Sequence, residues 1–232
     1  MIVLAVYILA AVLPAVILMR DVYRRDSVEQ EPVGLVGKLV LCGVGAAIIA
    51  GVAEPPVMAA LRMFVDPESK LYTVLTAFFA VALVEEGAKF LVLKQTTWND
   101  PHFNYRFDGI VYAVAVSLGF AAIENVIYVF QYGLSVAFTR ALLAVPGHMA
   151  FGVFMGMFYG RAKLCADYGD EARCRRNLWA GYLLAMLHHG FYDACALLDT
   201  NVSLAVFIAF VILMFLTVRV IVRREAATDT PV

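Results

Sequence analysis

Charged residues are scarce in this sequence. Asp, Glu, Lys and Arg make up 16% of its 232 residues, whereas soluble domains carry about 25%. Hydrophobic residues account for 62% of the chain, and the mean hydropathy is +0.81. This balance excludes a soluble globular enzyme and predicts a chain embedded in a lipid bilayer, so any active site must lie inside the membrane.

Cysteine content and net charge are low as well, and each excludes a class of protein. The formal net charge is -1 and the basic residues lie mostly in short loops, so nucleic acid is not an expected partner. No two cysteines form a CxxC pair, which argues against a disulfide framework and against a cysteine zinc site. The four cysteines are Cys42, Cys165, Cys174 and Cys195.

Several catalytic motifs are missing too. The sequence has no HExxH zinc motif, no Gly-rich phosphate loop and no GxSxG nucleophile elbow. It also lacks the paired Asp motifs of presenilin-like aspartyl proteases. Any metal site must therefore be assembled from separate helices, and a rhomboid-like serine protease is not indicated.

Long apolar runs predict an all-α, polytopic membrane helix bundle of about seven transmembrane helices. With the N-terminus outside and the C-terminus cytoplasmic, most of the 18 Lys and Arg residues fall on the cytoplasmic side, as the positive-inside rule requires. The runs cover about 2–19, 35–53, 71–93, 107–132, 139–160, 178–198 and 203–222.

The chain is expected to form a single integral-membrane domain over residues 1–232, with its catalytic helices within about 71–198. Residues 57–65 are expected to form a short interfacial helix after a Pro pair. Residues 225–232 are polar, and a flexible tail is expected there.

Ionisable side chains inside the predicted spans are the main functional signal. Each costs about 2.5 to 3.5 kcal/mol to insert into a bilayer, so such residues mark function unless they pair with one another. Four predicted spans carry them at similar depth, and we expect them to surround one polar cavity. The set is Glu85, Glu86 and Lys89, then Glu124 with Asn125, then His148, then His188, His189 and Asp193.

Spacing predicts contacts within this set, because residues three or four apart share a helix face. Lys89 is expected to neutralise either Glu85 or Glu86, while the other carboxylate faces elsewhere. His189 is expected to contact Asp193, which would orient the imidazole ring. By the same spacing, His188 is expected to pair with Tyr192.

Structural roles are the alternatives for several of these residues. Lys89 with one glutamate would also suit a buried ion pair, and Asn125 suits a hydrogen bond between helices. Gly152, Gly156 and Gly160 follow His148 at intervals of four and predict close helix packing. Pro146 and Gly147 are expected to loosen that helix just before His148.

Three further charged residues lie at predicted span ends, where a charged group can remain in contact with water at little cost in free energy. For this reason we assign no chemistry to Asp108, Arg140 or Asp199.

Two hydrolytic schemes fit the polar set, and the residues alone leave both open. In one, glutamate and histidine bind and deprotonate water directly. In the other, a divalent ion such as Zn²⁺ is held by Glu124, His148 and His189, with Glu85 or Glu86 as general base.

At these residues the sequence resembles the PrsW intramembrane proteases of bacteria, distant relatives of the CAAX prenyl-protease and Abi (CPBP) family. The resemblance rests on EEGAK at 85–89, FDGIVYAVAVSLGFAAIENVIY at 107–128, the stretch 138–163 and HHGFYD at 188–193. It implies catalytic roles for Glu85, Glu86, Glu124, His148 and His189, with Lys89 and Asp193 in support. We add Asn125 and His188, which adjoin two of these residues, as further supporting residues.

The resemblance also implies a substrate and a location. A protein of this kind would make the first, site-1 cleavage of a single-pass anti-sigma factor in the inner membrane of a bacterial cell. Two other classes compete with this interpretation, namely a proton- or cation-coupled transporter and a non-catalytic membrane scaffold or sensor. Intramembrane carboxylates and histidines also build proton relays, but the sequence shows no internal repeat of the kind common in carriers.

Overall fold

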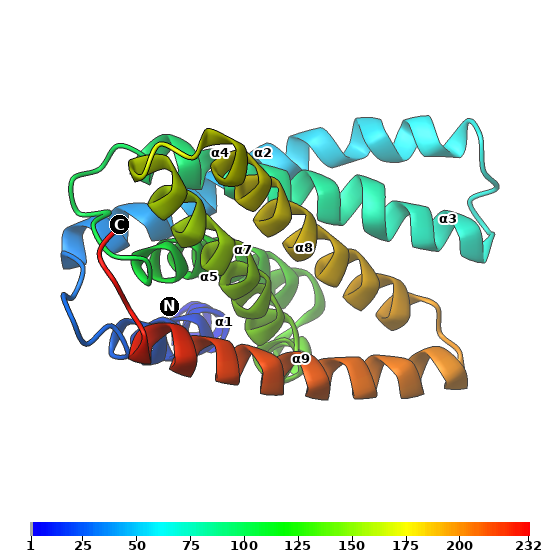
Figure 1. Ribbon diagram of the computed structural model, residues 1–232. Coiled ribbons are helices and arrows are strands. Elements are labelled where there is room, and N and C mark those ends of the chain that lie inside the picture. Colours follow the sequence, from blue (N-terminus) through cyan, green and yellow to red (C-terminus); the bar gives the residue numbers. More distant parts are fainter. Residues whose placement is uncertain (1) are drawn as a thin grey trace.

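The architecture is entirely helical over the residues that the structure describes. A computed structural model describes residues 2–232, with side chains from Leu4 onward (Figure 1). No β-strand occurs in this part of the chain, so the predicted all-α class is confirmed. The elements are α1 (Ile2–Tyr23), α2 (Val33–Arg62), α3 (Lys70–Leu75), the π-helix η1 (Thr76–Ala82), α4 (Leu83–Thr97), α5 (Asp108–Tyr132), α6 (Leu134–Leu142), α7 (Ala144–Asp167), α8 (Glu171–Leu197) and α9 (Asn201–Ala227).

Five of these helical segments are long and apolar enough to cross a membrane. They correspond to five of the seven predicted spans. The other two predicted spans correspond to the continuous helical stretch 70–97 and to α8, which carry most of the polar set. The five segments are Leu4–Tyr23, Val33–Arg62, Asp108–Tyr132, Leu134–Asp167 and Asn201–Ala227.

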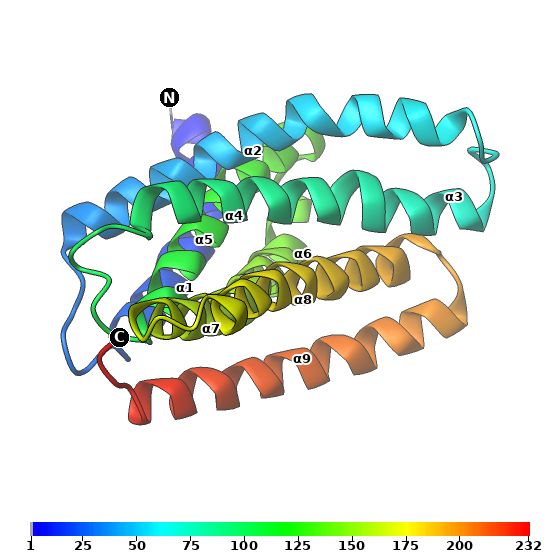
Figure 2. The same ribbon diagram turned by 45° about the horizontal axis from the view of Figure 1, so that its top comes forward.

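Helix α5 lies at the centre of the bundle. Every residue from Phe107 to Ala121 is buried, as expected for a helix that is apolar on all sides and enclosed by neighbours. The neighbours are α1, α2 and α7, while α8 packs on α7 and α9 lies along α8 (Figure 2). The second half of α5 therefore leads from the core toward the polar set.

The predicted close packing along α7 is confirmed, and the partner is α5. A Cβ atom added to Gly156 would lie 2.6 Å from the Cα of Ile110, and one added to Gly109 would lie 2.6 Å from the backbone nitrogen of Gly160. Backbone therefore meets backbone where the two helices cross, which is how small residues let helices associate in lipid.

The π-helix η1 runs directly into α4, the helix that carries Glu85 and Glu86. A short π segment inserts one extra residue into an α-helix, and such segments occur often at functional sites. The ring of Phe78 in η1 packs over Gly190 of α8, where a Cβ atom would lie 2.5 Å from the ring. Gly190 thus brings η1 close to α8 beside His189.

Two local expectations from the sequence are wrong, and one predicted span divides into two helices. Residues 57–62 continue α2 through Pro55 and Pro56 instead of forming a separate interfacial helix. The predicted span 139–160 is broken, since α6 ends at Leu142 and α7 begins at Ala144. Pro146 lies in the first turn of α7, where a helix does not need its N–H, so it does not loosen the helix.

The C-terminal tail, expected to be frayed, is instead held by hydrogen bonds. The backbone N–H of Arg106 donates to the carbonyl of Thr230 at 3.0 Å, and that of Val232 donates to the carbonyl of Asn104 at 2.9 Å. Asn104 also donates to Glu29 at 3.3 Å. Two connections, 24–32 and 98–107, therefore meet the C-terminal residues 228–232 at one end of the molecule, which we call the loop end (Figures 1 and 2).

Candidate active site

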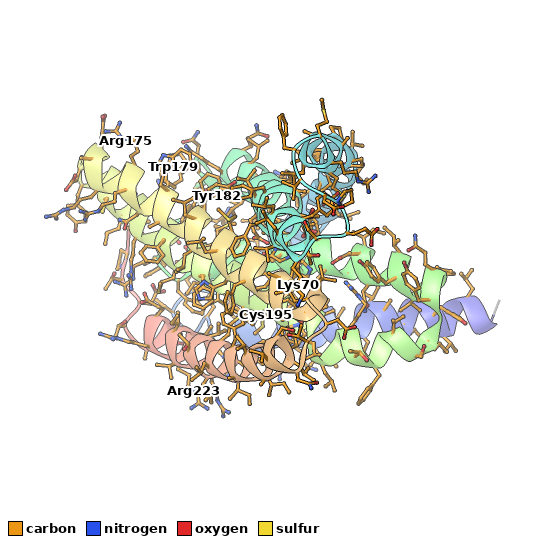
Figure 3. The ribbon with its side chains drawn as sticks, turned by 90° about the vertical axis from the view of Figure 1, so that its right-hand side faces the viewer. Lys70, Arg175, Trp179, Tyr182, Cys195 and Arg223 are labelled. Atoms are coloured by element: carbon orange, nitrogen blue, oxygen red, sulfur yellow. The ribbon has the colours of Figure 1, made fainter. Side chains whose placement is uncertain are left out.

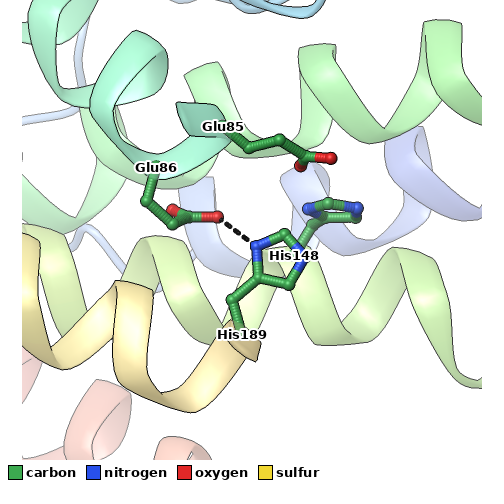
Figure 4. Close-up of side chains that lie close together, drawn as sticks. All are labelled: Glu85, Glu86, His148 and His189. Carbon is green, nitrogen blue, oxygen red and sulfur yellow. Dashed lines mark hydrogen bonds and ion pairs between the residues drawn. The ribbon is translucent and has the colours of Figure 1, made fainter. Parts of the chain in front are cut away.

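Four helices bring the predicted polar residues together inside the bundle. Helix α4 supplies Glu85, Glu86 and Lys89; α5 supplies Glu124; α7 supplies His148; and α8 supplies His189. The Glu85, Glu86, His148 and His189 side chains converge on one point from three helices (Figure 4). This is the common site that the distribution of ionisable residues predicts.

Lys89 is the central cation of the cluster. Its Nζ lies 3.2 Å from Glu85 Oε2, 2.7 Å from Glu86 Oε1 and 3.0 Å from His148 Nδ1. It also lies 4.0 Å from the centre of the Phe120 ring. The expectation that Lys89 neutralises only one glutamate is therefore wrong, because the ammonium group is shared between both carboxylates.

His189 is held on both sides. Its Nδ1 lies 2.9 Å from Glu86 Oε1, the contact drawn in Figure 4, and its Nε2 lies 3.3 Å from Asp193 Oδ2. The ring stacks on Phe151 with centroids 4.6 Å apart. The predicted contact with Asp193 is present, and Glu86 is the partner that the sequence did not identify.

His148 is oriented by an acidic partner of its own. Its Nε2 lies 2.9 Å from Glu124 Oε2, and the same carboxylate oxygen lies 3.0 Å from Arg140. Arg140 Nε donates to Asn125 Oδ1 at 3.0 Å, while Asn125 Nδ2 donates to the Ala11 carbonyl at 2.7 Å. Asn125 thus bonds between helices as predicted, whereas Arg140, to which we assigned no chemistry, belongs to the site.

His188 points away from the cluster, although it is adjacent to His189. Its Nδ1 lies 2.8 Å from the Leu184 carbonyl of its own helix. Its ring packs on Phe154 and Phe210. The expected pairing with Tyr192 is absent from the described contacts of His188, and of these two adjacent histidines it is His189 that joins the cluster.

A cavity of about 540 Å³ opens onto the cluster. Glu85 lines this cavity, together with Glu54 of α2. Glu86 is 0% exposed and lies behind His189. The two adjacent glutamates therefore have different environments, since Glu85 faces space that a substrate can enter and Glu86 faces protein. The other charged or imidazole groups on the cavity wall are Glu124, Arg140, His148, His189 and Asp193.

The cluster offers a donor set suited to a metal ion. Glu85, Glu86, His148 and His189 each present one ligand atom, and these four atoms lie within 4.8 Å of one another. Two nitrogens and two oxygens are the donors that zinc hydrolases use. Glu86 Oε2 is buried and has no hydrogen-bond partner, so the site contains an unsatisfied oxygen of the kind that a cation would engage.

The predicted metal-ligand set differs from the converging groups at Glu124. Glu124 is not among the four groups that converge; it contacts His148 at Nε2, on the side of the ring away from Lys89. Its position is that of a residue that orients a ligand. Lys89 contacts three of the four candidate ligands, so the ammonium group and an ion would draw on the same donors.

Comparisons with known proteins converge on one family. The family model described as PrsW family intramembrane metalloprotease matches residues 31–221. The chain is 36% identical to "Protease PrsW" of Geobacillus kaustophilus over 79% of its own length and 76% of that protein. It is 33% identical to "Protease PrsW" of Bacillus subtilis over 79% of each chain, and 29% identical to that of Clostridioides difficile over 89% and 86%. No solved structure matches the chain.

Proposed function

The chain belongs to the PrsW family of intramembrane metalloproteases, and from this premise we propose that Glu85 is the general base that activates water for hydrolysis of a peptide bond. The protein is a membrane-embedded protease. The observation that carries the proposal is the asymmetry of the glutamate pair, in which Glu85 lines the cavity while Glu86 lies behind His189. A general base must reach the proton that it removes.

The surrounding residues account for the rest of the reaction. Glu85 takes a proton from water as the water oxygen attacks the peptide carbonyl carbon. His189 is fixed by Glu86 and Asp193 and lines the same cavity, so its position relative to Glu85 is defined. When the C–N bond breaks, the leaving nitrogen receives the proton that Glu85 had taken. Lys89 offsets one of the two negative charges of the carboxylate pair.

A separate question is whether this protease uses a metal ion for catalysis. The family's description and the converging donors both favour a resident divalent ion, and we propose Zn²⁺ held by His148, His189 and Glu86. When bound, such an ion supplies Lewis-acid polarisation of the carbonyl and lowers the pKa of water. Glu124 then orients His148, as carboxylates commonly do for metal-bound histidines.

Metal removal tests this assignment. We expect 1,10-phenanthroline to lower cleavage of a reconstituted single-pass substrate by about 10²-fold or more, and Zn²⁺ to restore it, because Lewis-acid assistance would be lost. The measurement is cleavage rate in liposomes beside metal content by mass spectrometry. Full activity in protein that holds no metal would overturn the metallo assignment and leave Lys89 as the cation of the site.

The proposed substrate is a single-pass membrane protein resembling an anti-sigma factor, cleaved at site 1 in the inner membrane of a bacterial cell. The support is the family resemblance together with a cavity of about 540 Å³ between the helices, which has room for a segment of peptide. The same liposome assay tests it when anti-sigma factors are compared with unrelated single-pass proteins. Equal cleavage of both groups would contradict the substrate class. Family membership favours this function over a transporter or a scaffold.

We also propose seven membrane spans, with the N-terminus outside and the C-terminus cytoplasmic. The support is the uneven distribution of charge. The start of α8, with Arg175, and the end of α9, with Arg223, lie toward the loop end in Figure 1. Helix α3, which begins at Lys70, lies at the opposite end, the one that faces the viewer in Figure 3. Arg24, in the α1–α2 connection, lies at the loop end. Basic residues mark the cytoplasmic side of membrane proteins.

Cysteine labelling checks this topology. In a variant without the four native cysteines, we expect an impermeant maleimide added to intact cells to label Glu68→Cys in the α2–α3 loop. It should label Tyr168→Cys at the α7–α8 turn only after the membrane is permeabilised. Both positions are exposed, so a difference in labelling between them shows which side of the membrane each one occupies and does not reflect burial. The reverse pattern would invert the orientation.

A further inference from the structure

The loop end contains a second group of buried carboxylates, remote from the active site. Asp26 and Glu31 come from the α1–α2 connection, and Asp108 is the first residue of α5. They are 2%, 3% and 0% exposed, and one oxygen of each lies within 4.8 Å of the other two. Asp108 precedes Glu124 by 16 positions along α5, which is about 24 Å at 1.5 Å per residue. The two clusters are therefore separate sites.

Polar atoms in this group are left without partners. Asp26 Oδ2, Glu31 Oε2 and Asp108 Oδ1 are all buried and accept no hydrogen bond. The hydroxyl of Tyr112, one turn after Asp108, is fully buried, has no partner and faces Glu31. Buried polar atoms without a partner are rare in native proteins, and where they occur together a bound ion or water molecule commonly satisfies them.

The group also lacks a compensating positive charge. Among the described residues, no Lys or Arg forms an ion pair with Asp26, Glu31 or Asp108. Burial raises the pKa of Asp26 to about 6, with repulsion from Asp229 as the second cause, and burial raises the pKa of Glu31 to about 7. Carboxylates held together in a buried site either take up a proton, which the raised pKa values favour, or share a cation.

Backbone contacts fix Asp108 and the chain at Glu31. The second oxygen of Asp108 accepts from the N–H groups of Asn104 at 3.1 Å and Tyr105 at 2.7 Å. The Tyr23 hydroxyl donates to the Glu31 carbonyl at 2.8 Å, which ties the α1–α2 connection to α1. The Asp108 carboxylate is thus held by one oxygen while the other is left free, and the backbone at Glu31 is fixed beside it.

We propose that Asp26, Glu31 and Asp108 form a binding site for a hard divalent cation, Ca²⁺ or Mg²⁺, which fastens the α1–α2 connection to the start of α5. The three donors are all carboxylate oxygens, which these cations prefer. The active-site cluster has two imidazoles among its four candidate ligands, which suits Zn²⁺. The two clusters therefore select different metals.

Thermal unfolding of the purified full-length protein in detergent tests this site. After treatment with EDTA, we expect millimolar Ca²⁺ or Mg²⁺ to raise Tm by about 5 °C at saturating concentration, because the ion binds only the folded state. The separate Ca²⁺ and Mg²⁺ titrations show which of the two ions the site holds. Asp26→Asn and Glu31→Gln should each abolish the rise. Neither change threatens folding, since each removes charge repulsion, and in EDTA both variants should unfold at or above the wild-type Tm.

Two controls assign the effect to this group of residues. Asp21→Asn changes an exposed carboxylate paired with Arg25 in the same segment and should keep the full rise in Tm. His189→Ala alters the active site and should keep it as well. The proposal fails if neither ion raises Tm in the wild type, if the rise persists in Glu31→Gln, or if it disappears in His189→Ala.

Discussion

Replacing Glu85 by Gln is expected to lower kcat for peptide-bond cleavage by about 10²- to 10⁴-fold while leaving substrate binding almost unchanged. The amide keeps the shape of the side chain but cannot accept the proton from water, and general-base catalysis contributes rate factors of this size. The fold should persist because Lys89 retains its 2.7 Å contact with Glu86. The measurement is single-turnover cleavage in liposomes beside substrate capture by the same variant.

The comparison that makes this result decisive is with two other glutamates. Glu68→Gln changes an exposed residue in the α2–α3 loop and should leave cleavage intact. Glu86→Gln should also impair cleavage, but it removes a ligand proposed for the ion and a support of His189, so we expect it to lower metal content as well. If Glu85→Gln cleaves normally while Glu86→Gln is inactive, the roles of the two residues are the reverse of those proposed.

The histidine pair allows a second sharp comparison. We expect His189→Ala to lower cleavage by about 10²-fold or more, because the lost imidazole both faces the cavity and stands among the proposed ligands. Asp193→Asn, which removes only the carboxylate 3.3 Å from His189, should have an intermediate effect of about 10- to 100-fold. Cleavage rate and metal content of each variant provide the check.

His188→Ala is the matched control for that series. It removes the same side chain one position earlier, where the ring bonds the Leu184 carbonyl and packs on phenylalanines. A modest loss of thermal stability is expected, with cleavage near the wild-type rate. Equal losses of cleavage in His188→Ala and His189→Ala would contradict the assignment of the active-site register.

The helices and the polar set could be predicted from the sequence because both depend on local patterns. Runs of apolar residues locate the long helices, and an ionisable residue inside such a run stands out without any knowledge of its neighbours. Spacing within one helix also predicted that His189 contacts Asp193. These inferences need only the helical period and the unfavourable energy of charge in lipid.

Contacts between helices could not be predicted in the same way. The period of one helix does not determine how neighbouring helices are rotated about their axes. The contacts of His189 with Glu86 and of His148 with Glu124 therefore could not be predicted from the sequence. Arg140 and Asp108 were misjudged for a related reason. A position at the end of an apolar run can meet water or protein, and both residues meet protein.

The π-helix η1 makes the catalytic geometry depend on the length of the chain as well as on residue identity. Each residue advances an α-helix by about 100°, so the extra residue taken up between Thr76 and Ala82 sets the angular phase at which α4 presents Glu85 to the cavity. A single-residue deletion there would retain every active-site side chain but turn the glutamate pair away from the histidines. Substitutions in η1 would leave that phase intact, so insertions and deletions in this segment should be tolerated far less than changes of side chain.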